Sequence, residues 1–585
     1  MTGKVVNLEK ELQPDNLAHQ LMELYDKWFI NLSVKKAEWA ELRNYLFATD
    51  TATTSNQSLP WKNKTTIPKL TQIRDNLHAN YMDALFPNDD WLKWEGYDKS
   101  SVTKEKRIAI QTYMSNKLRL SGFRETISKC LYDYIDYGNA FAESIWVDEH
   151  YIDPITKEKI STYKGSKAVR ISPLDHIFNP TAAQYKDSPK FTRYLKNLGE
   201  LKKDILHYPE MKYDEGAFKK ATEARAKMTQ FRNEDIDKQQ AFYVDGFGSI
   251  KEYYQSGIIE IIEFEGDMYD SINDVLYENR IITIIDRCYI IRNIPNPNWF
   301  GKDTKSHVGW RERPDNLYAM GALDNLVGMQ YRLDHLENAK ADALDMSIQP
   351  PLVIKGDVEP FTWSPNVEIH VPEDGDVTML APNAAAFQVD NEISYLLQLM
   401  EEMAGAPKEA MGIRTPGEKT AFEVQQLQTA AGRIFQHKIN KFEIEFLEPL
   451  INDMLELAKR NLDIADVVSV IDSDLGVQSF LSVTKEDIQA KGKLRPIGAR
   501  HYAAQSLLFQ NLLGIFNSPI GQTIAPHVSA IELAYLVEEY MGLEKFQLIK
   551  PNVAVFEQAA TQKLVNTAGQ QVDTHAATPV EESLM

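Results

Sequence analysis

The fold of this chain is decided by the stretch Met411-Gly-Ile-Arg-Thr-Pro-Gly-Glu-Lys-Thr-Ala-Phe-Glu-Val424, together with the helical pattern that continues to Leu462. Its first part is a short loop rich in Gly and Pro that carries Arg414 and Lys419. Its second part has apolar residues at helical spacing over about ten turns. The segment predicts a loop held out from a rigid rod, which indicates a mechanical part.

The loop also resembles a phosphate-binding Gly-x-x-x-x-Gly-Lys-Thr sequence, from which it differs by one inserted residue, Glu418. The insertion displaces Lys419 by one residue and puts a carboxylate where phosphate charge would lie. A predicted helix ending at Gly405 precedes the loop, whereas a nucleotide-binding loop follows a buried strand. The sequence therefore favours a structural or contact loop over a nucleotide site.

A proline interrupts the long helix that follows the loop. Apolar residues keep the 3.6-residue period from Val424 to Ala458, and Pro449 falls inside this pattern. Proline cannot donate a backbone hydrogen bond, and its ring crowds the preceding turn. We predict a kink in the helix at Pro449.

The composition is that of a soluble globular protein with an acidic balance. Of the 585 residues, 43% are apolar and 25% are charged, which leaves room for two to four structural regions. Lys plus Arg number 64 and Asp plus Glu number 84, so the formal charge is 64 − 84 = −20. A nucleic acid would meet overall repulsion from such a chain.

The residues that usually carry catalysis or bind metals do not form a recognisable set. Cys130 and Cys288 are far apart and are the only cysteines, which excludes a disulfide scaffold or a thiolate metal site. There is no metal-binding histidine pair on one helix and no Gly-x-Ser-x-Gly sequence. We expect neither an enzyme nor a cofactor or metal site. No segment has the length of a signal peptide or a membrane span, so we expect a cytosol-like compartment.

The patterning predicts an α+β fold that is mainly helical. Helices are expected at 16–47, 73–85, within 104–137 and at 315–348, and strands at 141–147, 168–171, 258–264 and 281–291, with a loop at 293–314. The helix expected from Asp315 to Ile348 has a narrow apolar stripe, and acidic residues occupy its other faces. We expect these carboxylates to form an exposed acidic surface: Asp324, Asp334, Glu337, Asp342 and Asp345.

Taken in order, several segments resemble portal proteins of tailed bacteriophages, the head-to-tail connectors, and in particular those of short-tailed phages. They are Trp39-Ala-Glu-Leu-Arg-Asn-Tyr-Leu46, Met82-Asp-Ala-Leu-Phe-Pro87, Tyr134-Ile-Asp-Tyr-Gly-Asn-Ala140, Ile171-Ser-Pro-Leu-Asp-His-Ile-Phe-Asn-Pro-Thr181, Gln349-Pro-Pro-Leu-Val-Ile354, Thr420-Ala-Phe-Glu-Val424, Phe446-Leu-Glu-Pro-Leu-Ile451 and Gly492-Lys-Leu-Arg-Pro-Ile-Gly-Ala499. The resemblance rests on the order of these segments from Trp39 to Arg500. Phe422 differs from the family pattern, because relatives often have a small or polar residue at that position.

The resemblance implies a portal fold with wing, stem, clip and crown regions. Its parts would be a helical part of the wing (1–150), an α/β wing region (151–314), a descending stem helix (315–349), clip strands (350–390), an ascending stem helix (391–404), a tunnel loop (405–420), a long kinked helix with further wing (421–500), a helical crown (501–566) and a disordered tail (567–585).

The resemblance also implies a function. Portal subunits form a ring, usually of twelve, at one capsid vertex of the virion, and double-stranded DNA is packaged and ejected through this channel. Lys408, Arg414 and Lys419 would touch the DNA backbone without reading bases. The acidic wall, about −240 for twelve copies, would let the duplex slide. Implied partners are the terminase large subunit, a tail adaptor, and the major capsid and scaffolding proteins. Assembly would take place in the host cytoplasm, without a membrane.

Two other functions stay open at this point. One is a nucleotide-dependent DNA motor, which would bind or hydrolyse ATP. The other is a cytosolic helical scaffold unrelated to DNA, which would be a monomer or dimer rather than a wide ring.

Overall fold

The structure is a computed structural model that describes residues 4–8, 14–86, 91–98, 104–153, 155, 159–207, 212–227, 258–297, 303–356, 371, 375–380, 388–404, 435, 437–462, 465–471 and 478–497. The chain divides into two units, Met1–Pro496 and Ile497–Met585, and all helices and strands below belong to the first. Helices and antiparallel sheets occur together, which confirms the α+β class. The predicted tunnel loop (405–420), crown (501–566) and tail (567–585) lie outside the described residues.

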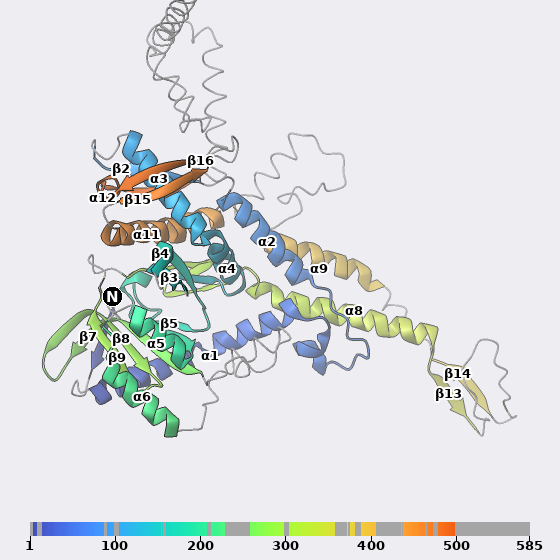
Figure 1. Ribbon diagram of the computed structural model, residues 1–585. Helices are drawn as coiled ribbons and strands as arrows, with labels where there is room; N and C mark the ends of the chain where they lie inside the picture. The colour runs from blue at the N-terminus through green and yellow to red at the C-terminus, as the bar shows by residue number, and fades with distance from the viewer. Residues whose placement is uncertain are drawn as a thin grey trace, which may run out of the picture. The chain divides into compact units, whose positions relative to one another are not determined.

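One sheet of six strands has a helical layer on each face (Figure 1). Its strands are β5 (His176–Phe178), β6 (Lys190–Lys196), β7 (Ile259–Asp270), β8 (Val275–Ile285) and β9 (Tyr289–Pro295) in that order, with β1 (Val5–Leu8) parallel to β7. Ile262 and Phe264 pack in one cluster with α1 (Pro14–Phe47). Ile261, on the opposite face, packs with α5 (Leu198–His207) and α6 (Glu215–Lys227), since side chains alternate along a strand.

The single strand expected at 281–291 was wrong, because this segment contains a turn between β8 and β9. Asp286 and Arg287 both have positive φ, at 47° and 64°, and the N–H of Cys288 donates to the carbonyl of Ile285 at 3.1 Å. A tight turn that joins antiparallel strands requires such angles, and Asp-Arg is a weaker signal for it than Asn-Gly. The apolar run is therefore a hairpin.

A second sheet contains β10 (Lys305–Gly309), β3 (Asn139–Ile152) and β4 (Lys159–Ile171) in that order. The loop expected at 293–314 was thus wrong in part, because β10 and β11 (Arg311–Arg313) lie within it. The main core joins this sheet to α2 (Lys69–Leu85), α3 (Lys104–Leu120), α4 (Phe123–Asp136), α8 (Val327–Ile348), α9 (Asp390–Met403) and α11 (Glu448–Asn461).

The C-terminal part of the first unit returns to its N-terminal helices. Strand β17 (Gly492–Pro496) pairs with β2 (Leu92–Gly96), so residues about 400 apart in sequence share a two-stranded sheet. The hairpin of β15 (Ala465–Ile471) and β16 (Gln478–Thr484) contacts α3, as does the short helix α12 (Lys485–Ile488). The N- and C-terminal portions of this unit therefore fold together.

The helix expected from Asp315 begins later, at Val327. Residues Asn316–Met320 form β12, which pairs with β11, and a short 3-10 turn at Asp324–Leu326 leads into α8. Gly321 lies so close to α4 that a Cβ atom there would be 2.7 Å from the carbonyl oxygen of Asp136. This close approach holds the chain extended where the helical pattern alone predicted a turn of helix.

Pro449, where the sequence predicts a kink, follows directly after a change in the hydrogen bonding of its helix. Residues Glu443–Leu447 form a π-helical turn, and α11 follows with Pro449 in its first turn. A proline is tolerated there because its nitrogen has no hydrogen to donate. The kink itself stays a prediction. The first part of the predicted helix, up to residue 434, lies outside the described residues.

A glycine at the junction of α4 and β3 gives a test of this packing. Gly138 has a φ of 71°, and a Cβ atom there would lie 2.3 Å from the carbonyl carbon of Met320. Gly122 has a similar φ of 69° but has nothing within 4 Å of that position. We predict that Gly138→Ala destabilises the protein by more than about 3 kcal/mol, and Gly122→Ala by only about 1 kcal/mol. Thermal unfolding of both variants measures the difference, and equal shifts would contradict the close contact.

Candidate functional site

Helix α8 carries a stripe of polar side chains that binds residues 61–70, an extended segment that leads into the first turn of α2 and that we call the anchoring segment. Four backbone N–H groups of this segment donate in order along the helix: Asn63 to Asp342 (2.9 Å), Thr65 to Asn338 (2.8 Å), Ile67 to Asp334 (3.0 Å) and Leu70 to Gln330 (3.3 Å). Two extended residues span about 6.6 Å and four helical residues about 6 Å, so the two repeats match from Asn63 to Ile67.

The stripe also satisfies carbonyl groups of the anchoring segment. The side-chain amide of Asn338 donates to the carbonyl of Thr65 at 2.7 Å, and that of Gln330 donates to the carbonyl of Ile67 at 2.6 Å. The helix thus offers acceptors and donors alternately, as a neighbouring strand would. Residues 61–68 are half-buried or exposed, and the ladder pairs those of their backbone groups that face α8.

Asp334 lies in the centre of the ladder and is fully buried. Its carboxylate accepts hydrogen bonds from the Thr66 hydroxyl at 2.9 Å, the Ile67 N–H at 3.0 Å and the Gln330 amide at 2.9 Å. Burial raises the pKa of Asp334 to about 6, against the opposing effect of these donors. The expectation that Asp334 belongs to an exposed acidic surface was therefore wrong.

Two further acids of the predicted surface bind groups of the same chain. Asp324 accepts from the Lys35 ammonium at 2.7 Å, and its side chain is 9% exposed. Asp342 accepts from the N–H groups of Lys62 and Asn63, which hold its pKa below the usual value although partial burial raises it. Both carboxylates are half-buried and bind groups of the same chain.

The remaining acids of the prediction are more accessible. Glu337 is half-buried, and Asp345 is exposed and accepts one hydrogen bond from the Asn63 amide at 3.0 Å.

The anchoring segment itself was missed by the sequence analysis, because its Thr, Asn and Lys residues resemble those of a surface linker. The signal that could have revealed it is the four-residue spacing of polar residues on α8, which puts them on one face.

Helices α8 and α9 pack side by side in opposite directions (Figure 1). Lys340 of α8 pairs with Asp390 at the start of α9 at 2.5 Å. Glu401 near the end of α9 forms a buried ion pair with Lys69, beside the residue that binds Gln330. Ile393, Leu396 and Met400 face the main core. The residues between the two helices include the hairpin of β13 (Leu352–Lys355) and β14 (Asp376–Met379).

Apolar side chains become exposed where α8 leaves the core, and we call this set the apolar end. It consists of Leu344, Met346 and Ile348 on α8, Ile354 and Met379 on the hairpin, and Leu380 after it. Ile348 is 72% exposed and Met379 is 55% exposed. A soluble chain rarely leaves such a group of apolar side chains in water unless a partner covers them.

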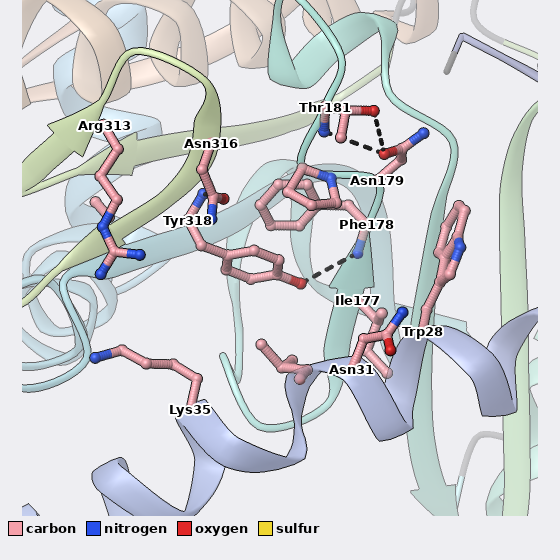
Figure 2. Close-up of a pocket in the computed structure, with 13 residues that line it drawn as sticks. Trp28, Asn31, Lys35, Ile177, Phe178, Asn179, Thr181, Arg313, Asn316 and Tyr318 are labelled. Carbon is pink, nitrogen blue, oxygen red and sulfur yellow. Dashed lines mark hydrogen bonds between the residues drawn. The ribbon is translucent and has the colours of Figure 1, made fainter. Parts of the chain in front are cut away.

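A pocket of about 350 Å³ lies beside α1 (Figure 2). Trp28, Phe178 and Tyr318 give it aromatic walls, and the Tyr318 hydroxyl accepts a hydrogen bond from the Phe178 N–H at 3.3 Å. Lys35 and Arg313 lie at its rim. The residues suit an apolar group with a hydrogen-bond-accepting end.

The predicted DNA-facing residues Lys408, Arg414 and Lys419 lie outside the described residues. Among those that are described, no three His, Cys, Asp or Glu side chains gather as a metal ion would need. None of the described helices combines the length and apolar character needed to cross a bilayer.

The chain matches no known family model, and no curated protein shows significant sequence similarity to it.

The buried acid of α8 is open to a direct test. Asp334→Ala would leave the Thr66 hydroxyl and the Ile67 N–H without their acceptor, which should cost on the order of 2–3 kcal/mol of folding free energy. Asp345→Ala removes one exposed contact and should change stability by less than about 0.5 kcal/mol. Thermal unfolding compares them, and trypsin cleavage after Lys62 or Lys64 should be faster only in the first variant. Similar behaviour of both variants would contradict the anchoring role.

Proposed function

We propose that this chain is a portal protein, a subunit of a ring-shaped channel at one capsid vertex through which double-stranded DNA is packaged and ejected. The observation that carries the proposal is the antiparallel pair α8 and α9, which is anchored in the core at one end and joined through the β13–β14 segment at the other. This helix–hairpin–helix unit lies where the sequence resemblance expects the stem and clip.

The apolar end supports an assembled state. Ile354 and Met379 lie on the same face of the hairpin, because Ile354 pairs with Val377 and Met379 with Leu352. In a closed ring each subunit can cover this face with a different surface of its neighbour. The same assembly would turn the α8–α9 side of each subunit toward its neighbours and give a stem around a central passage.

The charge supports a conduit rather than a tight DNA-binding protein. A subunit charge of −20 repels phosphate groups, so the duplex would find no deep binding site along the wall. Lys408, Arg414 and Lys419, in the proposed tunnel loop, would supply local contacts to the DNA backbone. The proposed partners are terminase and a tail adaptor at the hairpin end, and capsid and scaffolding proteins around the ring.

The assembly predicts a change in particle size when the apolar end is made charged. The wild-type protein should sediment as a species many times heavier than its 66.8 kDa chain. The double variant Ile354→Asp/Met379→Asp should shift toward the single chain, because the aspartates would be buried without partners. Gln57→Asp/Gln184→Asp adds the same charge at exposed positions and should leave the assembly intact. A monomeric wild type, or no effect of the first variant, would contradict this interface.

The tunnel-loop assignment predicts a defect in DNA handling. Particles built with Lys408→Ala/Arg414→Ala/Lys419→Ala should package less DNA or fail to retain it, while ring assembly survives, because the loop contacts the DNA backbone and not the neighbouring subunit. The length of the packaged genome, measured by gel electrophoresis, is the readout. The exposed lysines Lys203, Lys219 and Lys220 provide a matched triple-alanine control. An unchanged genome length in the loop variant would remove these residues from the DNA path.

A further inference from the structure

A buried group of charged side chains joins the two large sheets of the first unit. At its centre is Lys305 of β10, whose side chain is 1% exposed. Its ammonium donates to Glu263 at 3.1 Å and to Glu265 at 2.9 Å, both on β7 of the other sheet. Lys305 also lies opposite Glu143 of β3 in the antiparallel register. One cation thus faces three carboxylates.

Two other cations complete the group. Lys190 of β6 forms a buried ion pair with Asp303, which lies two residues before the start of β10. Arg292 of β9 forms an ion pair with Glu263. We call these seven residues the inter-sheet cluster: Lys190, Arg292, Lys305, Glu143, Glu263, Glu265 and Asp303.

The inter-sheet cluster has one more acid than base. With all groups ionised, four carboxylates face three cations, which leaves a net charge of −1 in the interior. Lys196 and Asp204 at its edge pair with each other at 2.6 Å and leave this difference unchanged. An uncompensated buried charge costs several kcal/mol, so the folded chain gains by taking up one proton at this place.

The positions of the cations indicate which carboxylate holds the proton. Glu263 has Lys305 and Arg292 beside it, and these hold its pKa below the usual value although burial raises it. Glu265 shares Lys305 with Glu263 and also faces the carboxylate of Asp303. Burial, together with Asp303, raises the pKa of Glu265 to about 7.

The other groups around Glu265 do not change this charge balance. Tyr185 is buried and Tyr194 is half-buried, and desolvation raises the pKa of both hydroxyls, so they stay neutral. His176 stays neutral because burial, Lys305 and Lys190 lower its pKa. The amide of Asn296 donates to Glu265 at 3.2 Å, which either protonation state accepts. Glu143, with a pKa also raised by burial, faces Lys305 from the second sheet.

We propose that the inter-sheet cluster is a proton-binding switch, in which Glu265 is protonated below neutral pH and loses its proton as the pH rises, weakening the contact between the two sheets. The unfolded chain would release this proton near the ordinary glutamate pKa of 4.5. Between that value and about 7 the folded chain holds the proton and the unfolded chain does not. This contribution to stability therefore decreases as the pH rises through this window and is absent above it.

Thermal unfolding of the full chain from pH 5 to pH 8.5 tests the proposal. Glu265→Gln keeps the shape of the protonated side chain without the titration. The melting temperature of Glu265→Gln relative to wild type should rise between pH 5 and pH 7 and then stay level. Per pH unit, the unfolding equilibrium constant of the variant relative to wild type should change by up to about tenfold. Glu278→Gln, at an exposed position on the neighbouring strand β8, should differ from wild type by a constant amount.

A second variant keeps the test decisive if Glu265→Gln folds poorly. Asp303→Asn removes a different carboxylate and leaves three acids against three bases, so Glu265 should ionise at lower pH. The same rise relative to wild type between pH 5 and pH 7 is expected, whatever the absolute melting temperature. A constant difference from wild type across the whole range, in either folded variant, would overturn the proposal.

Discussion

The hydrogen-bond ladder between the anchoring segment and helix α8 is the interaction on which the rest of the arrangement depends. Four backbone N–H groups, from Asn63 to Leu70, bind four polar side chains spaced one helical turn apart. The ladder fixes the direction of α8 and covers its polar face, so this face is not available to line a channel. Beyond Ala343 the helix is exposed, and its apolar residues there belong to the surface that we propose for assembly.

Much of the fold follows from local patterns in the sequence. The α+β class and the helices α1 and α2 were predicted from apolar spacing. The errors occur where contacts between distant segments decide the backbone. Gly321 packs against α4 and keeps the preceding residues in a strand, although their apolar spacing resembles that of a helix. The turn at Asp286 and Arg287 depends on the pairing of β8 with β9, which periodicity alone does not show.

The candidate site was less predictable than the fold. A carboxylate on a patterned helix looks the same in sequence whether it faces water or binds a buried N–H group. Asp334 and Asp342 were expected on a surface, and both bind the anchoring segment. Lys305 and Glu265 gave no signal, because the inter-sheet cluster assembles from strands that are far apart in the chain. The order of the resembling segments predicts a subunit of a larger assembly, and this stays a prediction.

The proposal of a portal ring is tested most directly by electron microscopy of the purified full-length protein, with rotational averaging of the particles. A portal subunit should give wide rings of uniform symmetry, usually twelvefold, with a hole along the axis. The stem formed by α8 and α9 should narrow this hole. Single chains or dimers without a central hole, at concentrations where the protein is soluble and folded, would contradict the proposed function.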